Sequence, residues 1–252
     1  MSLLLNMELS MVHRLRTIAV CGGWVTRITG QALTKYTSLS LDGSTVWSYG
    51  MPELKSWVAI TNTGEVNPSG VNVYIGGQPA NVPYNIDYEN GLVVFNGNPG
   101  GAVTADFTQY SMVVRRGHPD RQYVDVGQLP IVAIDPPSSR NVPFAIGTPR
   151  AKICKISTSV LIMTLTPGER LRISELLNDM LRWIPICDMA SNQPLLFGGR
   201  INPGFVYAQS LIGMAQFRTQ YPSSTILSPV RNRTNKEFHQ GTVNLNFEFY
   251  PQ

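Results

Sequence analysis

Residues 84–95 read Tyr-Asn-Ile-Asp-Tyr-Glu-Asn-Gly-Leu-Val-Val-Phe, and this stretch decides the fold class that the sequence predicts. Asn90 and Gly91 stand between two apolar-rich runs, and both residue types tolerate the positive φ that a type I′ turn requires. A two-residue loop at this point pairs Tyr88 with Val93 across an antiparallel hairpin. The residues that then share one face are Tyr84, Ile86, Tyr88, Val93 and Phe95.

The segments on either side of this hairpin also have strand patterns. Residues 71–75 are rich in Val, Tyr and Ile and end at a Gly pair, and apolar and polar residues alternate over 103–107. We expect both segments to extend the hairpin into one antiparallel meander. Further strands are expected at 38–41, 45–49, 57–61 and 110–115.

The second half of the chain mixes strand and helix patterns. Strands are expected at 129–134, 152–165 and 243–250, with a loop at 138–141. Thr166-Pro167-Gly168-Glu169 is a capping box that opens an amphipathic helix, which we expect over 170–183 with Pro185 ending it.

A first amphipathic helix is predicted over residues 3–19. Its charged face is expected to be solvated, and contact with another subunit is the alternative.

These segments together predict an α+β, β-rich fold with an antiparallel meander domain plus an antiparallel sheet with one packed amphipathic helix. The expected divisions are an N-terminal helical segment (1–35), a β-meander domain (36–120) and an α+β domain (121–252). The polar break at 116–121 marks the boundary. Within the last domain, 188–235 is expected to hold short strands and arms that reach outward.

The composition of the chain narrows the class of protein. Of its 252 residues, 14% are charged, against roughly 25% in an average soluble domain. So few charges suit a subunit that neighbours cover. The formal net charge of +4 permits contact with a polyanion without arguing for it.

The three cysteines are far apart and indicate free thiols in a reducing compartment. Neither a membrane span nor a secretory signal is expected.

No catalytic, cofactor-binding or metal-binding residue is predicted, and enzymatic function is disfavoured. His13, His118 and His239 lack neighbours at metal-ligand spacing. Nucleophile-elbow and phosphate-loop motifs are absent from the sequence.

Charged residues offer two weaker signals. The carboxylates of Asp87, Glu89 and Asp106 are expected to gather on one polar face of the meander, where solvation is favoured over a glycosidase pair or a calcium site. Two basic clusters are expected to be solvated or to form intersubunit ion pairs, because no aromatic platform is interleaved with them. Their residues are Arg115, Arg116, His118 and Arg121, and Arg231, Arg233, Lys236 and His239.

Three parts of the first half, Val73-Tyr74-Ile75-Gly76-Gly77, 84–95 and 101–107, resemble a β-meander common in structural proteins of tailed-bacteriophage virions. The second half, with its strands at 129–134 and 152–165 and its helix at 170–183, is similar to the α+β tail-terminator and neck proteins. Such proteins form rings that join head to tail or close the tail tube. This chain is longer than a plain tail-terminator protein, because the meander and the 188–235 arms are additional.

The resemblance implies a ring-forming virion structural protein at the neck, either at the head–tail junction or as a tail terminator. It implies no catalytic role, no cofactor and no membrane, with assembly in the host cytoplasm. The implied partners are copies of the same chain and other phage neck, tail or baseplate proteins, and contact with genomic DNA in the channel stays open. The 188–235 region is expected to supply much of the intersubunit contact, with the N-terminal helix second.

Two alternatives stay open. A baseplate or tail-tip adaptor belongs to the same structural class. A glycan- or receptor-binding β module belongs to a different class, in which Tyr74, Tyr84 or Tyr88 would stack on sugars.

Overall fold

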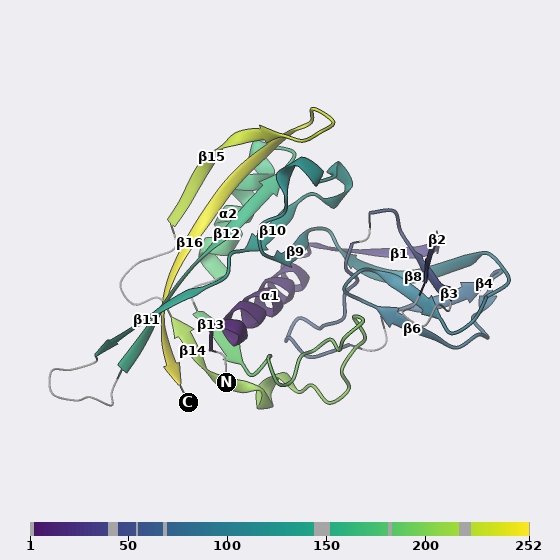
Figure 1. The fold of residues 1–252 in the computed structure, drawn as a ribbon, viewed down its shortest axis with the longest axis horizontal. Helices are drawn as coiled ribbons and strands as arrows, with labels where there is room; N and C mark the ends of the chain where they lie inside the picture. The colour runs from purple at the N-terminus through teal and green to yellow at the C-terminus, as the bar shows by residue number, and fades with distance from the viewer. Residues whose placement is uncertain are drawn as a thin grey trace. The chain divides into compact units, whose positions relative to one another are not determined.

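The computed structural model describes residues 3–39, 45–53, 55–67, 70–143, 152–180, 183–216 and 223–251. The chain divides into two units, coloured by residue number in Figure 1. Unit 1 comprises residues 1–18, 112–192 and 206–252, and unit 2 comprises 19–111 and 193–205. Both units are rich in antiparallel strands and two α-helices are described, so the predicted α+β, β-rich class is confirmed.

Unit 2 contains two four-stranded antiparallel sheets. The first sheet has, in order, β1 (Val25–Ala32), β8 (Val103–Tyr110), β4 (Asn72–Ile75) and β5 (Gln78–Pro79). The second has β2 (Thr34–Leu39), β3 (Thr45–Gly50), β7 (Leu92–Phe95) and β6 (Tyr84–Asp87). The predicted strands at 71–75 and 103–107 therefore exist, but they pair with each other, for example Val73 with Ala105. The prediction that they extend the hairpin into one meander is wrong.

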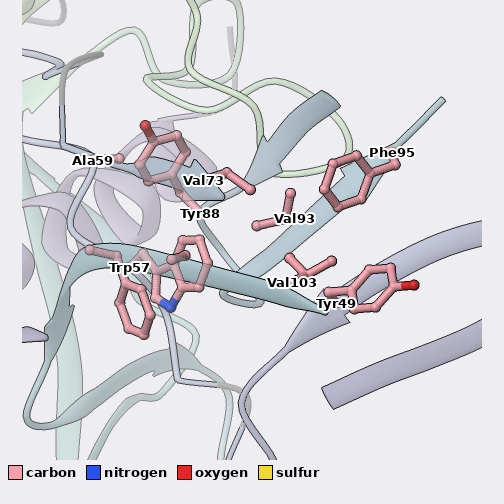
Figure 2. Packing of buried hydrophobic residues seen from close by; sticks show 10 residues of the cluster. Tyr49, Trp57, Ala59, Val73, Tyr88, Val93, Phe95 and Val103 are labelled. Atoms are coloured by element: carbon pink, nitrogen blue, oxygen red, sulfur yellow. The ribbon is translucent and has the colours of Figure 1, made fainter. Parts of the chain in front are cut away.

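The two sheets of unit 2 share one apolar core. Figure 2 shows Tyr49, Val93 and Phe95 of the second sheet beside Val73 and Val103 of the first. Each sheet has one apolar face, and burying these faces against each other explains why two layers form instead of one long sheet.

Trp57 belongs to the same core but lies outside the regular strands. Its ring stacks on that of Phe107, with 4.2 Å between ring centroids. The strand predicted at 57–61 is wrong, because only isolated bridges form there, from Trp57 to Gln109 and from Ile60 to Val66.

The hairpin at 84–95 is present with a longer loop than predicted. Asp87 pairs with Leu92, so four residues connect β6 and β7 and the register differs from the predicted one by two residues. The cause lies in the backbone of Tyr88. Its N–H donates to Gly199 O at 3.0 Å and its carbonyl accepts from Trp57 N–H at 2.8 Å.

A shift of two residues keeps the same side chains on the same face, so the predicted core face survives. Gly91 has a φ of 65°, as predicted, but Asn90 is not among the described residues with positive φ, so the type I′ turn is wrong. The Asp87 carboxylate instead holds Asn90, accepting from its backbone N–H at 3.1 Å and from Nδ2 at 2.7 Å.

Unit 1 is built on an eight-stranded sheet with the order β13-β14-β16-β12-β10-β9, on which β11 also pairs with β12 and β15 with β16. Its strands are β9 (Val113–Arg116), β10 (Ile131–Ile134), β11 (Ser138–Pro143), β12 (Lys152–Thr164), β13 (Trp183–Cys187), β14 (Leu211–Gln216), β15 (Ser223–Arg231) and β16 (Glu237–Pro251). Three short 3-10 helices are η1 (Arg121–Tyr123), η2 (Val126–Gln128) and η3 (Tyr207–Gln209). The pairs are antiparallel except β9 with β10, which are parallel.

Several predictions for unit 1 are corrected by this sheet. Residues 138–141, predicted as a loop, belong to β11, and Pro185 lies in β13 instead of ending a helix. The strand predicted at 243–250 is part of β16, which lies inside the sheet between β12 and the strands β14 and β15. Within 188–235, where short strands and outward arms are expected, β14 and β15 are strands of this sheet and pair with β16.

Helix α2 (Pro167–Met180) follows the predicted signal closely. Thr166 Oγ1 accepts from Glu169 N–H at 3.2 Å, which confirms the predicted N-cap, and Pro167 is the first helical residue. Ile173 and Leu177 are fully buried. The helix ends before the predicted 183 because the chain enters β13 there.

Helix α1 (Leu3–Cys21) differs from the solvated amphipathic helix that the pattern predicts. Polar side chains on it are buried, including Asn6, Glu8 and Ser10. Each has a partner within unit 1; for example, Glu8 forms a 2.8 Å ion pair with Arg116. The hydrogen bond to Glu8 raises the pKa of Arg116.

The unit boundaries differ from the predicted domains for physical reasons. The N-terminal helix joins the C-terminal sheet because its polar groups bond there, and the break falls at 111–112 because β9 pairs with β10. Residues 193–205 join unit 2, where Leu195 and Ile201 pack against the core.

Candidate functional site

The three histidines lie in separate environments. His13 is buried in α1, with its ring centroid 5.1 Å from that of Tyr207. His118 Nε2 lies 2.8 Å from Asp135 Oδ1, and His239 lies in β16. Within the described ranges, no three His, Cys, Asp or Glu side chains come close enough together to hold a metal ion.

Asp135 is the centre of a polar group in unit 1 that the sequence did not reveal. Its carboxylate accepts from Ser159 Oγ on one oxygen and contacts His118 Nε2 on the other. Its backbone carbonyl accepts from Thr158 Oγ1 at 2.7 Å, and its N–H donates to Ser159 O at 2.9 Å. The three residues meet because β9 and β10 run parallel, and only that unpredicted pairing brings His118 beside the end of β10.

Serine, histidine and aspartate are the residue types of a nucleophilic triad, but here they are in a different order. A triad needs the histidine between the serine and the carboxylate, so that the imidazole removes the serine proton. Here the carboxylate lies between Ser159 and His118. The arrangement anchors the end of β10 to β12 and places the Asp135 carboxylate, instead of the His118 imidazole, against the Ser159 hydroxyl.

The surface around Asp135 is a broad, shallow depression of about 560 Å³. It is lined by Asp135, Pro136, Ser157, Thr158, Ser159, Asn244 and Asn246. Ser157 Oγ donates to Asn246 Oδ1 at 2.7 Å. This lining offers hydroxyl and amide groups with one carboxylate and no aromatic ring, which suits hydrogen bonding to a flat polar surface better than enclosing a small molecule.

The carboxylates Asp87 and Asp106 do not gather on one face, because β6 and β8 belong to different sheets. Asp106 accepts from Gly30 N–H at 2.7 Å and from Tyr74 OH at 3.0 Å. The Gly30 hydrogen bond, followed by that of Tyr74, lowers the pKa of Asp106, and the bond to Asp106 raises the pKa of Tyr74. Glu89 is exposed in the hairpin loop.

The two basic clusters come partly together in unit 1. Asn232, in the turn after β15, donates from Nδ2 to Val124 O at 3.1 Å, and the Arg233 guanidinium lies 4.6 Å over the Tyr123 ring. The sequence offered Tyr123 two residues after Arg121, but its stacking on Arg233 could not be foreseen. The clusters are also interleaved with acids, since Arg231 lies 3.5 Å from Glu237.

The three tyrosines considered for sugar stacking are engaged elsewhere in unit 2. Tyr88 is 5% exposed, and burial, followed by the effect of Tyr84, raises its pKa. The Tyr84 ring lies against the Phe95 ring at 5.8 Å between centroids, and Tyr74 OH donates to Asp106. Burial excludes Tyr88 from stacking on a sugar, whereas Tyr74 and Tyr84 are only half-buried.

Strand β15 forms an open edge of the unit 1 sheet. In the described part of the chain it pairs with β16 alone, and Figure 1 shows it on the outer side of that strand. Ile226 on this strand is 65% exposed. Ile226 pairs with Gly241 of β16, and a Cβ built on Gly241 would meet the Arg170 side chain of α2. Because residues directly opposite each other in an antiparallel pair lie on the same face, Ile226 lies on the face of the sheet that α2 covers.

Comparisons with protein-family models, with characterised proteins and with solved structures found no match. None of the described helices has the length and apolarity needed to cross a membrane. The function must therefore be inferred from the chain itself.

Proposed function

We propose that this chain is a structural subunit of a tailed-phage virion and forms a homo-oligomeric ring at the neck, as a head–tail junction or tail-terminator protein. The observation that carries the proposal is the open edge of β15 with its exposed Ile226. An unprotected edge strand offers unpaired backbone groups to another chain, and proteins that stay monomeric blunt such edges.

The features that would prevent another strand from pairing with β15 lie at one end of this strand. Pro229 and a register shift between Leu227 and Val230 disturb the end near Arg231. Residues 223–227 carry no charge, no proline and no bulge. This half of the strand is therefore suited to pair with a neighbouring copy, which would cover Ile226.

In a heterologous contact, the β15 edge of one subunit meets a different surface of the next subunit. Such contacts form a ring when the rotation from one subunit to the next returns to the first subunit. The low content of charged residues, 14% of the chain, supports extensive coverage by neighbours. The shallow polar depression around Asp135 supports the same interpretation, since its hydroxyl, amide and carboxylate groups suit contact with a polar surface. A baseplate or tail-tip adaptor would use the same surfaces, and the resemblance of the second half favours the neck.

The test is the mass of the purified full-length chain by mass photometry, with negative-stain images. We expect oligomers with ring-shaped particles. Ile226→Lys should reduce the oligomers to small species with an unchanged melting temperature, and Ile226→Val is the matched control that should keep the rings. A wild-type chain that stays monomeric in analytical ultracentrifugation at about 100 μM, a concentration at which a contact with a Kd of about 1 μM is occupied, would overturn the proposal.

A further inference from the structure

The segment 195–201 of unit 2 presents an aromatic side chain at the tip of a tight loop. Phe197 is 101% exposed, and the neighbouring Leu196 is exposed as well. A fully solvated phenyl ring beside a second apolar side chain is the kind of feature that marks a contact with another molecule.

This loop is held in place by its own backbone and by the core of unit 2. Leu196 N–H donates to Arg200 O at 2.7 Å and Gly199 N–H donates to Leu196 O at 3.0 Å. Below the tip, Leu195 and Ile201 form a bridge and pack against the core. A side chain presented by so constrained a loop loses little conformational entropy on binding.

A depression of about 410 Å³ lies on the same surface, directly beside the loop. It is lined by Tyr84, Asn85, Ile86, Tyr88, Leu196, Arg200, Ile201 and Pro203. Apolar and aromatic groups dominate this lining, and the volume exceeds that of a phenyl ring. Leu196 belongs both to the loop and to the wall of the depression, so protrusion and depression are parts of one patch.

We propose that a second copy of this chain docks here by a two-fold contact, in which Phe197 of each copy enters the depression of the other. A two-fold contact requires a self-complementary patch, and a protruding ring next to a receiving depression is one. Arg200, which lines the depression, adds one cationic group to the patch.

The expected strength of this contact is low for one pair and higher for an assembly. Two buried phenylalanines remove about 400 Å² of surface, and the walls that receive them add less, because each depression is open and shallow. The total lies well below the roughly 1,200 Å² of a stable interface. Repeated around two facing rings, the same contact gains from avidity. This last step rests on the proposed function, whereas the pairing of two single copies does not.

The experiment measures mass by analytical ultracentrifugation and mass photometry for the full-length chain and its variants. Phe197→Ser should weaken pairing on the order of 10³-fold, because the change removes two central side chains from each contact. Rings that face each other should then separate into particles of half the mass. Leu165→Ser, which removes an exposed leucine of unit 1, is the matched control and should leave the mass unchanged.

Ile226→Lys breaks the ring contact and should leave dimers at high concentration, so the two proposals succeed or fail separately. An unchanged mass for Phe197→Ser overturns the pairing. Binding to phosphatidylcholine–phosphatidylglycerol vesicles that Phe197→Ser abolishes, without a change in mass, overturns it in favour of a lipid surface.

Discussion

The two units hold their sequence-distant segments together by different means. In unit 2, the segment 193–205 and the hairpin loop meet through backbone groups, and the fit depends on glycines that leave no room for a side chain. In unit 1, helix α1 is attached through polar side chains that are themselves buried. Unit 2 should therefore be destabilised by substitutions that add a side chain at these glycines, and unit 1 by substitutions that remove the buried polar side chains.

Gly91 and Gly199 show the close approach in unit 2. A Cβ built on Gly91 would overlap Lys55 O and lie 2.9 Å from Trp57 Nε1. A Cβ on Gly199 would overlap the Asp87 carboxylate. Both glycines also have positive φ, which side chains rarely adopt, so geometry and space require glycine for separate reasons.

Asn6 and Ser10 show the opposite device in unit 1. Asn6 Nδ2 donates to Asp188 Oδ1 at 3.2 Å, and its Oδ1 accepts from Ala190 N–H at 2.7 Å. One helical turn later, Ser10 Oγ accepts from Cys187 N–H at 3.0 Å. These bonds satisfy the backbone at and just after the end of β13, where the sheet pairing stops.

The largest expected effect comes from Gly91→Val. The positive φ and the overlap with Lys55 O together cost about 3–5 kcal/mol of unfolding free energy. Urea denaturation should show this loss or a chain that does not fold. Gly97→Val is the control, because a Cβ there meets nothing within 4 Å and no positive φ is involved. Equal midpoints for Gly91→Val and the parent would contradict the close approach at this loop.

A smaller loss of unfolding free energy is expected when a buried polar side chain of α1 is replaced by alanine. Asn6→Ala removes two part-buried hydrogen bonds, one of them to a carboxylate, which together contribute about 2–3 kcal/mol. Ser10→Ala removes one neutral hydrogen bond and should cost about 1 kcal/mol. Urea denaturation followed by Trp fluorescence measures both. If neither substitution lowers the urea midpoint, the attachment of α1 depends on apolar packing alone.

The smallest effect is expected from Asp106→Asn, and it depends on pH. Because the folded pKa of Asp106 is lowered below the unfolded value of about 3.9, its ionised form stabilises the fold fully above that value and loses the contribution as pH falls through the folded pKa. The variant should melt slightly below the parent at pH 7, and the difference should shrink below about pH 4. A melting-temperature difference that stays constant from pH 7 to pH 2.5 would show that the carboxylate charge is not involved.

Local signals in the sequence predicted the elements that are formed by neighbours in the chain. The capping box at Thr166 and Glu169 and the alternation along 152–164 needed only residues close in sequence, and α2 and β12 appear as expected. The hairpin register failed for the opposite reason. Its loop is set by Gly199 and Trp57, and no pattern within 84–95 reveals those partners.

The same limit applies to the candidate sites. Nothing near His118 in the sequence indicates Asp135, because the parallel pair of β9 and β10 brings the two together, and the antiparallel pair of β10 and β12 adds Ser159. The N-terminal helix looked amphipathic, and its polar face is buried because Asp188 and Ala190, far along the chain, bond to it. Phe197 carried no strand or helix pattern, and only its exposure draws attention to it.

The late arrival of residues 193–205 has a consequence for synthesis of the chain. Roughly 80 residues separate Ser111 from this segment, so at about 5–20 residues per second a ribosome needs several seconds to supply it. Until then the Tyr88 N–H has no acceptor from Gly199, and the core lacks Leu195 and Ile201. A ribosome that stalls before this segment therefore holds a chain with an uncovered apolar surface, which is a substrate for chaperones and proteases. Unit 2 is therefore complete only after the chain has been synthesised through residue 205.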